Sequence, residues 1–237
     1  MNEEKLDTNK DEGDKKESFY IATPLSRQRL PAILEPYTEA LEELFKACRE
    51  VCMTLLEAAA VALKMSDHRY FVDRHNGYDD RLRLLHYPPS PINVEAIRAG
   101  AHTDYGSFTV LFQRDVSGLQ VLVDDRWIDV EPPARGTVVV NVADALEFWS
   151  EGVLCSAQHR VVMPRTQNEA VSRFSIAFFC QPDAHADLTP VKVTSIRRKR
   201  TSAQYLDELK RKGINSASAE LTGGQHLQAR LQASYGL

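Results

Sequence analysis

The sequence predicts a mixed α and β domain that begins with a long helix, continues as an antiparallel sheet structure and closes with helices. Three observations support this order. Apolar residues recur every three or four positions between residues 30 and 64, which is typical of an amphipathic helix. Short apolar or alternating runs, bounded by Gly, Pro, Asp and Ser, fill residues 81–180 and indicate the many short strands of a sandwich or barrel. Helical patterns return near Ser202–Lys212 and Gly224–Ser234.

The polar N-terminal segment is expected to lie outside this domain. Residues 1–17 are mostly Asp, Glu, Lys and Asn with almost no apolar content, a composition that favours a disordered tail. Residues 18–237 then form a single domain, which is long enough to bury a sizeable core.

The expected elements follow from the positions of the apolar residues. The helix should start at Leu30 and continue to about Lys64, with one polar face, so that it packs along a sheet. Its apolar positions are Leu34, Tyr37, Leu41, Leu44, Phe45, Cys48, Val51, Cys52 and Leu55. The strand-like runs are Arg81–Tyr87, Ser107–Gln113, Leu119–Val123, Trp127–Val130, Thr137–Val142, Ser156–Met163 and Val171–Cys180.

Charge and composition exclude several classes of partner. The formal net charge is -4, so neither nucleic acid nor an acidic membrane surface is an expected partner. No apolar run is long enough for a membrane span, and Met1–Asp7 lacks the apolar stretch of a secretory signal. The four cysteines match neither a zinc pattern nor a disulfide framework, so we expect free thiols and a reducing, cytoplasmic compartment.

His102, Asp104 and His159 are the candidate metal ligands. Side chains two residues apart on a strand point to the same face, so His102 and Asp104 can bind one metal side by side. His159 is the best third ligand, because the hairpins of an antiparallel sandwich can return a later strand beside the first. A His-x-Asp triplet alone is most often an ordinary pair of polar residues, so the assignment depends on the surrounding motifs.

This ligand set suggests a particular metal and co-substrate. Two imidazoles and one carboxylate on one face of an octahedron suit Fe(II) and leave three coordination positions open. Two of these positions can hold a bidentate 2-oxo acid, and the third can hold O2. We therefore expect Fe(II), 2-oxoglutarate and O2, with a small molecule as the substrate.

Arg173 and Ser175 form the candidate anchor for the co-substrate. They share one face of a mostly apolar strand, and the planar guanidinium of Arg173 suits a carboxylate. The distal carboxylate of 2-oxoglutarate fits this pair, and the phenol of Tyr87 can contribute to the same site. The alternative is a structural salt bridge from Arg173 to an Asp or Glu, with Tyr87 as a half-buried aromatic at the end of a strand.

Three aromatic residues are candidates for the substrate pocket. Alternation from Arg173 points Phe179 inward, and alternation from His102 points Phe108 inward. Trp149 precedes a Glu-Gly turn and can line the mouth of a pocket. Packing in the hydrophobic core is the alternative role for Phe108 and Phe179, and capping of the turn is the alternative for Trp149.

Taken together, these motifs resemble the isopenicillin N synthase-like branch of the 2-oxoglutarate/Fe(II)-dependent dioxygenase superfamily. The similarity runs from about Lys15 to Tyr235. Its motifs, in family order, are Leu82–Pro89 (LRLLHYPP), Ala101–Gly106 (AHTDYG), Gly118–Val121 with Trp127–Val130, Gly136–Asn141 with Asp144, Gln158–Val161 (QHRV) and Arg173–Ser175 (RFS). Six motifs in the right order are far more specific than any one of them.

The resemblance implies a double-stranded β-helix (jelly-roll) core supported by the long helix. It also implies hydroxylation, desaturation or cyclisation of a small organic, secondary metabolite, with release of succinate and CO2. Halogenating relatives lack the carboxylate ligand, so Asp104 favours these three reactions over halogenation. Two alternatives remain: a 2-oxoglutarate-independent non-haem Fe(II) oxidase, and a catalytically silent jelly-roll binding protein.

The chain departs from the family pattern in several places, including a longer stretch from His159 to Arg173. The region before the long helix is shortened, and Lys15–Ala22 represents most of it. Ala143 stands where the family's NxGD turn has Gly, a change that we expect to be mild if the backbone φ there is not positive.

Overall fold

The computed structural model describes residues 14–93, 95–193, 196 and 200–236. Most of the predicted tail, residues 1–13, lies outside the described residues. Residues 14–17 were also assigned to the tail, but the Lys15 amide donates to the Arg98 carbonyl at 3.0 Å and Glu17 begins the first strand. The ordered domain therefore starts earlier in the sequence than we predicted.

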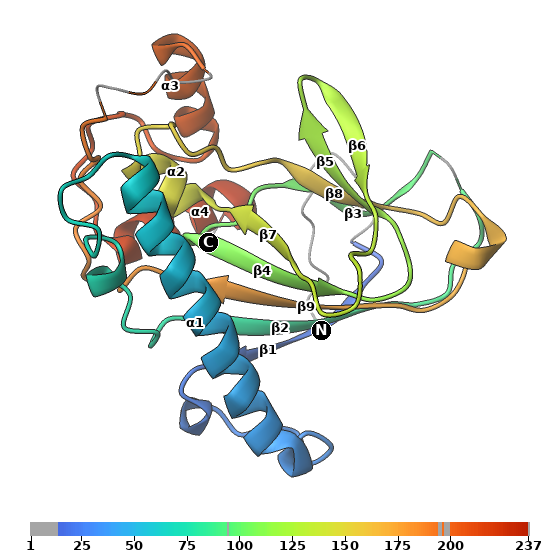
Figure 1. Ribbon diagram of the computed structural model, residues 1–237. Coiled ribbons are helices and arrows are strands. Elements are labelled where there is room, and N and C mark those ends of the chain that lie inside the picture. The colour runs from blue at the N-terminus through green and yellow to red at the C-terminus, as the bar shows by residue number, and fades with distance from the viewer. Residues whose placement is uncertain (1–13, 94, 194–195, 197–199, 237) are drawn as a thin grey trace.

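Nine strands and four α-helices make up the described fold (Figure 1). The strands are β1 Glu17–Ala22, β2 Arg81–Tyr87, β3 Ile97–His102, β4 Phe108–Gln113, β5 Leu119–Val123, β6 Arg126–Val130, β7 Val139–Val142, β8 His159–Val162 and β9 Arg173–Cys180. The α-helices are α1 Thr38–Ala62, α2 Asp144–Trp149, α3 Ser202–Arg211 and α4 Gly223–Tyr235. Short 3-10 turns lie at Leu25–Arg27, Glu35–Tyr37, Val72–Arg74 and Gln167–Glu169.

The strands form two antiparallel sheets. The larger sheet has the order β1-β2-β9-β4-β7, and the smaller has the order β3-β8-β5-β6. Neighbours such as β2 and β9 are distant in sequence, as a jelly-roll requires. The predicted antiparallel sandwich is confirmed, and both sheets contribute side chains to one cavity between them.

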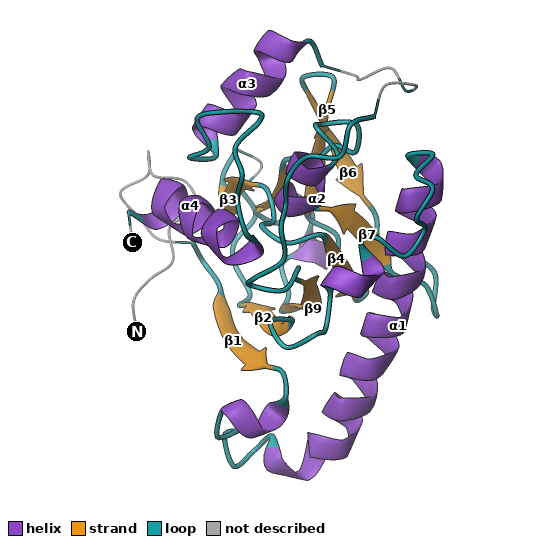
Figure 2. Cartoon of the chain, turned by 90° about the vertical axis from the view of Figure 1, so that its left-hand side faces the viewer, coloured by secondary structure: helices purple, strands orange, loops and turns teal. Residues whose placement is uncertain are grey.

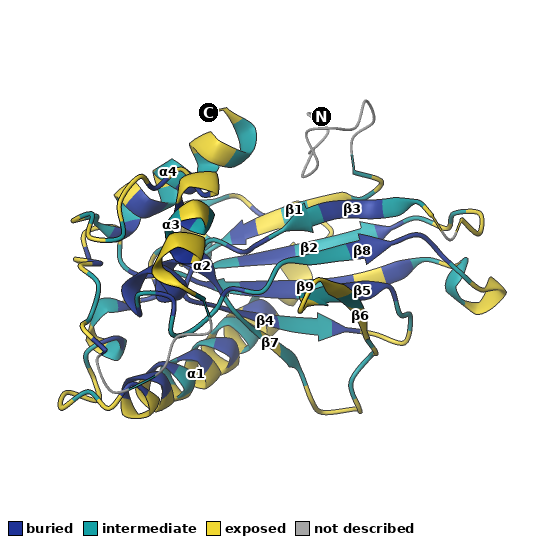
Figure 3. Ribbon diagram, turned by 90° about the horizontal axis from the view of Figure 1, so that it is seen from above, coloured by how far each residue is buried: buried dark blue, intermediate teal, exposed yellow. Residues whose placement is uncertain are grey.

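Helix α1 covers the outer face of the larger sheet (Figure 1). It begins at Thr38 rather than at Leu30, because Pro31 and Pro36 cannot donate the backbone hydrogen bonds of a helix interior. Its buried residues are Leu41, Cys48, Cys52, Leu56, Ala59 and Ala60, and Figure 3 shows the exposed residues on the opposite side. Val51 was expected on the apolar face but is 41% exposed.

Strand alternation gives the larger sheet two different faces. Leu82, Val110 and Phe178 point outward and pack with α1 in the main core. Their neighbours Arg83 and Ala177 point to the other side and line the cavity. Each central strand is therefore fixed by apolar packing on one face while the other face remains available for a site.

Helices α2, α3 and α4 lie together at one end of the two sheets (Figure 1). Figure 2 shows α1 and α4 on opposite sides of the strands. Helices α3 and α4 each begin with a capping box, formed by Thr201 with Gln204 and by Thr222 with Gln225. Among the described residues, no helix is both long and apolar enough to cross a membrane.

Helix α2 was not predicted from the sequence. It is only six residues long, and all of its residues are buried, so it shows no amphipathic period. Ala143, at its N-terminal boundary, has an extended backbone with φ of -115°. The replacement of Gly by Ala at this position is therefore compatible with the turn.

The orientation of α1 can be tested by a matched pair of substitutions. Leu56→Ala is expected to lower the free energy of unfolding by about 2–5 kcal/mol, because Leu56 is fully buried and its truncation leaves a cavity. Val51→Ala, on the exposed side, should change it by about 0.5 kcal/mol or less. Urea denaturation followed by circular dichroism measures both values, and equal losses would contradict the assigned orientation.

Candidate active site

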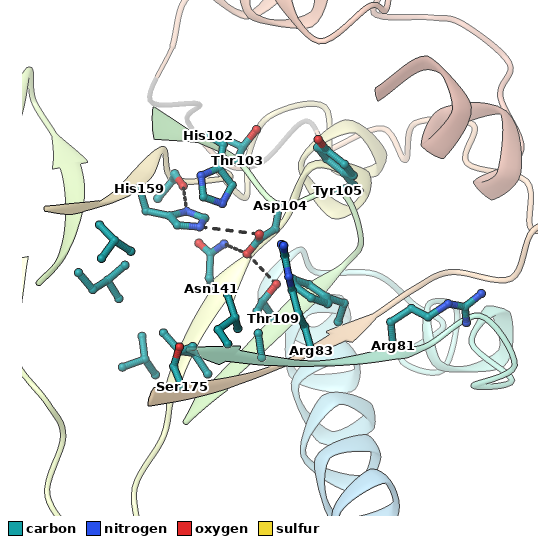
Figure 4. A pocket seen from close by; sticks show the side chains of 18 of the residues that line it. Arg81, Arg83, His102, Thr103, Asp104, Tyr105, Thr109, Asn141, His159 and Ser175 are labelled. Atoms are coloured by element: carbon teal, nitrogen blue, oxygen red, sulfur yellow. Dashed lines mark hydrogen bonds and ion pairs between the residues drawn. The ribbon is translucent and has the colours of Figure 1, made fainter. Parts of the chain in front are cut away.

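The smaller sheet brings the three predicted metal ligands together. His102 ends β3 and His159 begins β8, and the two residues are directly paired across these strands. Asp104 follows β3 by two residues. The potential ligand atoms of the three side chains all lie within 4.8 Å of one another, and His159 Nε2 is 3.7 Å from Asp104 Oδ1 (Figure 4).

Backbone carbonyls orient both imidazoles. His102 Nδ1 donates to the Gly100 carbonyl at 2.8 Å, and His159 Nδ1 donates to the Ala157 carbonyl at 3.1 Å. These contacts leave each Nε2 as the nitrogen that is free to bind a metal. Burial, reinforced by the neighbouring His159, lowers the pKa of His102 to about 3 and so favours its neutral form.

The larger sheet holds the carboxylate of Asp104. Its Oδ2 accepts hydrogen bonds from Thr109 Oγ1 at 2.7 Å and from Asn141 Nδ2 at 3.0 Å (Figure 4). Thr109 on β4 and Asn141 on β7 are paired in register, so their side chains reach the same oxygen. With Oδ2 engaged in this way, Oδ1 is the oxygen that faces His159 and the potential metal position.

The loop that carries Asp104 packs tightly against the end of β9. A Cβ atom at Gly106 would collide with the Cys180 carbonyl oxygen, so only Gly fits at this position. The next residue, Ser107, is fully buried and its hydroxyl lies 2.8 Å from His75 Nε2. Since His75 Nδ1 donates to the Phe71 carbonyl, its neutral Nε2 accepts from Ser107.

Arg173 is a buried cation without an acidic partner among the described residues. Its side chain is 2% exposed, Nη2 donates to Gln113 Oε1 at 2.8 Å, and Nε has no hydrogen-bond acceptor in the described part of the chain. Tyr87 provides an aromatic face 5.1 Å from the guanidinium carbon. Burial lowers the pKa of Arg173, and only the Tyr87 hydroxyl opposes that shift. Among the described residues, Arg173 forms no structural salt bridge to an Asp or Glu, so its guanidinium is suited to an external anion.

The anchor residues and the metal ligands line the same cavity. Its volume is about 560 Å³, and its wall includes Arg173 and Ser175 together with the three potential ligands. The wall between these polar groups is mainly apolar, with Leu85, Leu111, Leu119, Val121 and Val139 among its residues. A mainly apolar cavity with a few convergent polar groups is typical of a site for small molecules.

Comparison with known proteins supports this interpretation of the site. A model of the 2OG-Fe(II) oxygenase superfamily matches residues 78–182. The 2-oxoglutarate-dependent dioxygenase htyE of Aspergillus rugulosus is 40% identical over 154 residues, which are 60% of this chain and 46% of that protein. Proline hydroxylase buaE of Petromyces alliaceus is 30% identical over 236 residues, which are 94% of this chain and 69% of that protein. Among solved structures, a full-length Neurospora crassa protein in complex with alpha-KG and 5-formyluracil has a TM-score of 0.74 at 32% identity, covering 93% of this chain and 70% of that chain.

The chain belongs to the 2OG-Fe(II) oxygenase superfamily. Both the predicted family and its jelly-roll fold are confirmed. The chain spans 46% of the length of the dioxygenase and 69% of the length of the proline hydroxylase. In the family, the co-substrate is 2-oxoglutarate and the metal is Fe(II), which agrees with the donor set of this cavity.

The structure separates the three aromatic candidates for the substrate pocket. Phe179 lines the cavity. Phe108 instead packs in the hydrophobic core on the α1 side, because residues 103–107 form a loop and the alternation of β3 does not continue into β4. Trp149 is fully buried at the end of α2, with its ring 5.0 Å from that of Phe71, and it is a core residue rather than a residue of the cavity wall.

Sequence reasoning missed the polar residues that hold the site from the larger sheet. Thr109, Gln113 and Asn141 lie on strands that are otherwise apolar, and each contacts a predicted site residue. A single polar residue on an otherwise apolar strand is a signal for a residue of the site. The assignment of Phe108 to the inner face of β4 placed Thr109 on the outer face, so this signal was not used.

The metal assignment makes a prediction about affinity. Asp104→Ala is expected to abolish Fe(II) binding at this site, because it removes one of three ligands. Thr109→Val keeps all three ligands but removes the hydroxyl that orients Asp104, so Fe(II) affinity should fall by about 10- to 100-fold. Anaerobic calorimetric titration measures both effects. Thr137→Val, which removes an exposed hydroxyl bonded to the Ala134 carbonyl, is the matched control, and equal affinities for both Thr variants would contradict the role of Thr109.

Stability below neutral pH should depend on His75. Burial lowers the pKa of His75 from 6.5 to about 4, against the opposing hydrogen bond to the Phe71 carbonyl. The unfolded chain therefore binds a proton more readily at this residue, so its contribution to stability is complete above pH 6.5 and is lost as the pH falls toward 4. His75→Gln should flatten the pH dependence of the unfolding free energy in this window. If the unfolding free energies of the variant and the parent change equally with pH, His75 does not titrate between pH 6.5 and 4 on unfolding.

Proposed function

We propose that this chain is an Fe(II)- and 2-oxoglutarate-dependent oxygenase that hydroxylates, desaturates or cyclises a small organic molecule. One observation carries the proposal. A buried guanidinium without an acidic partner among the described residues, Arg173, lines the same cavity as a two-histidine, one-carboxylate cluster. The cluster alone fits several metals, but the cation beside it specifies an anionic co-substrate.

His102, Asp104 and His159 would hold Fe(II). Both histidines present Nε2 because their Nδ1 atoms are engaged by carbonyls, and Asp104 presents Oδ1 because Oδ2 is engaged by the larger sheet. Three protein ligands would leave further coordination positions of Fe(II) for a co-substrate and O2. When bound, Fe(II) supplies the activation of O2 that no amino-acid side chain provides.

Arg173, with Ser175 and Tyr87, would bind the distal carboxylate of 2-oxoglutarate. Gln113 holds one end of the guanidinium, so its planar face and remaining N–H groups are oriented before the co-substrate enters. Ser175 lines the cavity two residues along the same strand and adds a hydroxyl. The apolar residues of the cavity wall lower the local dielectric constant, which strengthens the charge interaction.

The rest of the cavity wall is suited to a mainly apolar substrate. Tyr20 and Phe179 lie on the larger sheet with ring centroids 6.4 Å apart, and Leu227, Leu231 and Tyr235 contribute from α4. Arg83 adds a buried guanidinium to the same wall. A cavity of about 560 Å³ holds a small metabolite together with the co-substrate rather than a macromolecule.

The anchor role of Arg173 can be tested by binding. Arg173→Gln is expected to weaken 2-oxoglutarate binding to the Fe(II)-loaded chain by roughly 30-fold or more, because removal of one partner from a buried charge pair costs about 2–5 kcal/mol. Its Fe(II) affinity should remain unchanged, since no metal ligand is altered. Anaerobic titration calorimetry measures both values.

Arg165→Gln is the matched control for this experiment. Arg165 forms an ion pair with Asp129 at 3.0 Å and its side chain is 30% exposed, so its loss changes the net charge equally but leaves the cavity intact. Its 2-oxoglutarate affinity should equal that of the parent. Unchanged 2-oxoglutarate affinity in Arg173→Gln, with Fe(II) still bound, would favour an oxidase that does not use this co-substrate.

A further inference from the structure

A cluster of buried charges joins helices α2, α3 and α4. We call Asp144, Glu147, Lys212 and Arg230, together with Arg200, whose side chain is 30% exposed, the buried ion cluster. Asp144, Glu147 and Lys212 are each at most 4% exposed, and Arg230 is 6% exposed. Lys212 Nζ contacts both carboxylates, at 2.7 Å for Asp144 Oδ1, and Arg200 Nη1 binds Glu147 Oε1 at 2.5 Å. Buried ions at this density must be closely matched, because removal of one leaves another unpaired.

Asp144 connects this cluster to the loop of the metal site. Its Oδ2 accepts from Arg230 Nε at 2.7 Å and from Thr103 Oγ1 at 2.9 Å. Its backbone amide donates to the carbonyl oxygen of Asp104 at 2.9 Å. Burial raises the pKa of Asp144, but Lys212 and Arg230 together lower it by more. The pKa therefore lies below its usual value and the carboxylate remains charged.

Arg230 contacts the residues on both sides of Asp104. Its Nη2 lies 3.5 Å from Thr103 Oγ1, and its guanidinium carbon lies 4.9 Å from the centre of the Tyr105 ring. These contacts, with the bond to Asp144, restrict the loop that carries Asp104. The carboxylate of Asp104 is thus positioned from two directions, by Thr109 and Asn141 on one oxygen and by Arg230 through the backbone of its own loop.

The helix that carries Arg230 also forms part of the cavity wall. Leu227, Leu231 and Tyr235 recur at four-residue steps on α4, and all three line the cavity. Arg230 therefore joins the wall against which a substrate lies to the loop that carries a metal ligand.

We infer that Arg230, acting through Asp144 and Thr103, is a positioning residue for the metal ligand Asp104 and couples the α4 wall of the cavity to the metal site. This inference rests on the proposed function. It assigns a role to a side chain that touches neither the metal position nor the co-substrate anchor. A merely structural ion pair would change the stability of the fold and leave the metal site as it is.

The test is the binding of Co(II), used as a spectroscopic substitute for Fe(II), to the full chain. Arg230→Gln is expected to weaken Co(II) binding by about 10- to 100-fold and to shift the visible ligand-field bands, because loss of a supporting hydrogen bond alters ligand geometry. Arg230→Lys keeps the charge and one donor to Asp144, so it should restore much of the affinity. Thr103→Val removes the hydroxyl that bonds to Asp144 without changing any charge. It should shift the bands in the same direction as Arg230→Gln.

Arg200→Gln is the matched control. It removes another guanidinium from the buried ion cluster, but Arg200 bonds to Glu147 and not to Asp144 or Thr103. We expect it to lower the thermal stability while Co(II) affinity and the bands stay those of the parent. Equal changes in Arg200→Gln and Arg230→Gln would overturn the inference, because the effect would then come from general destabilisation.

The proposed function and this inference fail in different ways. If the parent chain does not bind Co(II), or binds it equally well after His159→Ala, the proposed function is wrong and the inference falls with it. If the parent binds through His159 but both Arg230→Gln and Thr103→Val leave the affinity and the bands unchanged, only the inference is overturned.

Discussion

The carboxylate of Asp104 is the point at which the two sheets and the helical side of the molecule meet. Its Oδ2 is held by the larger sheet, through Thr109 and Asn141, while its loop continues from the smaller sheet that carries both histidines. That arrangement depends on α1. Because α1 buries Phe108 and Val110 on the outer face of β4, Thr109 between them must point into the cavity. Apolar packing on one side of β4 thus decides which polar group reaches the carboxylate of Asp104 on the other side.

The two ends of the cavity carry opposite charges, Asp104 at one end and Arg173 at the other, and both charges are supported by uncharged neighbours. Asp104 is supported by a hydroxyl and an amide, which orient it without neutralising it, so its charge remains available to a cation. Arg173 is supported by the amide of Gln113 and by the ring of Tyr87, so its charge remains available to an anion. Asp144, in contrast, is neutralised by Lys212 and Arg230, so its charge is not available to a ligand. The same residue types therefore have different roles because their partners differ.

The sequence predicted which candidate site residues come together, because His102 pairs with His159, Asp104 follows His102 by two residues, and Arg173 and Ser175 share β9. It failed where an outcome depends on neighbours that are distant in the chain. The side of β4 that faces the cavity is set by α1 and not by the distance from His102, so Phe108 was misplaced. The start of α1 was placed too early because Pro31 and Pro36 lie within an otherwise helical pattern. Arg230 gave no signal at all, since its partners Asp144 and Thr103 are far from it in sequence.

Joint binding of Fe(II) and 2-oxoglutarate in one cavity can be tested by visible absorption spectroscopy. Fe(II) and then 2-oxoglutarate are added to the chain under nitrogen while the visible absorption is recorded. Chelation of Fe(II) by the 2-oxo acid should produce a broad metal-to-ligand charge-transfer band, which disappears when Asp104 is replaced by Ala. Fe(II) binding without this band, or a band that persists in Asp104→Ala, would contradict the binding of both groups in this cavity.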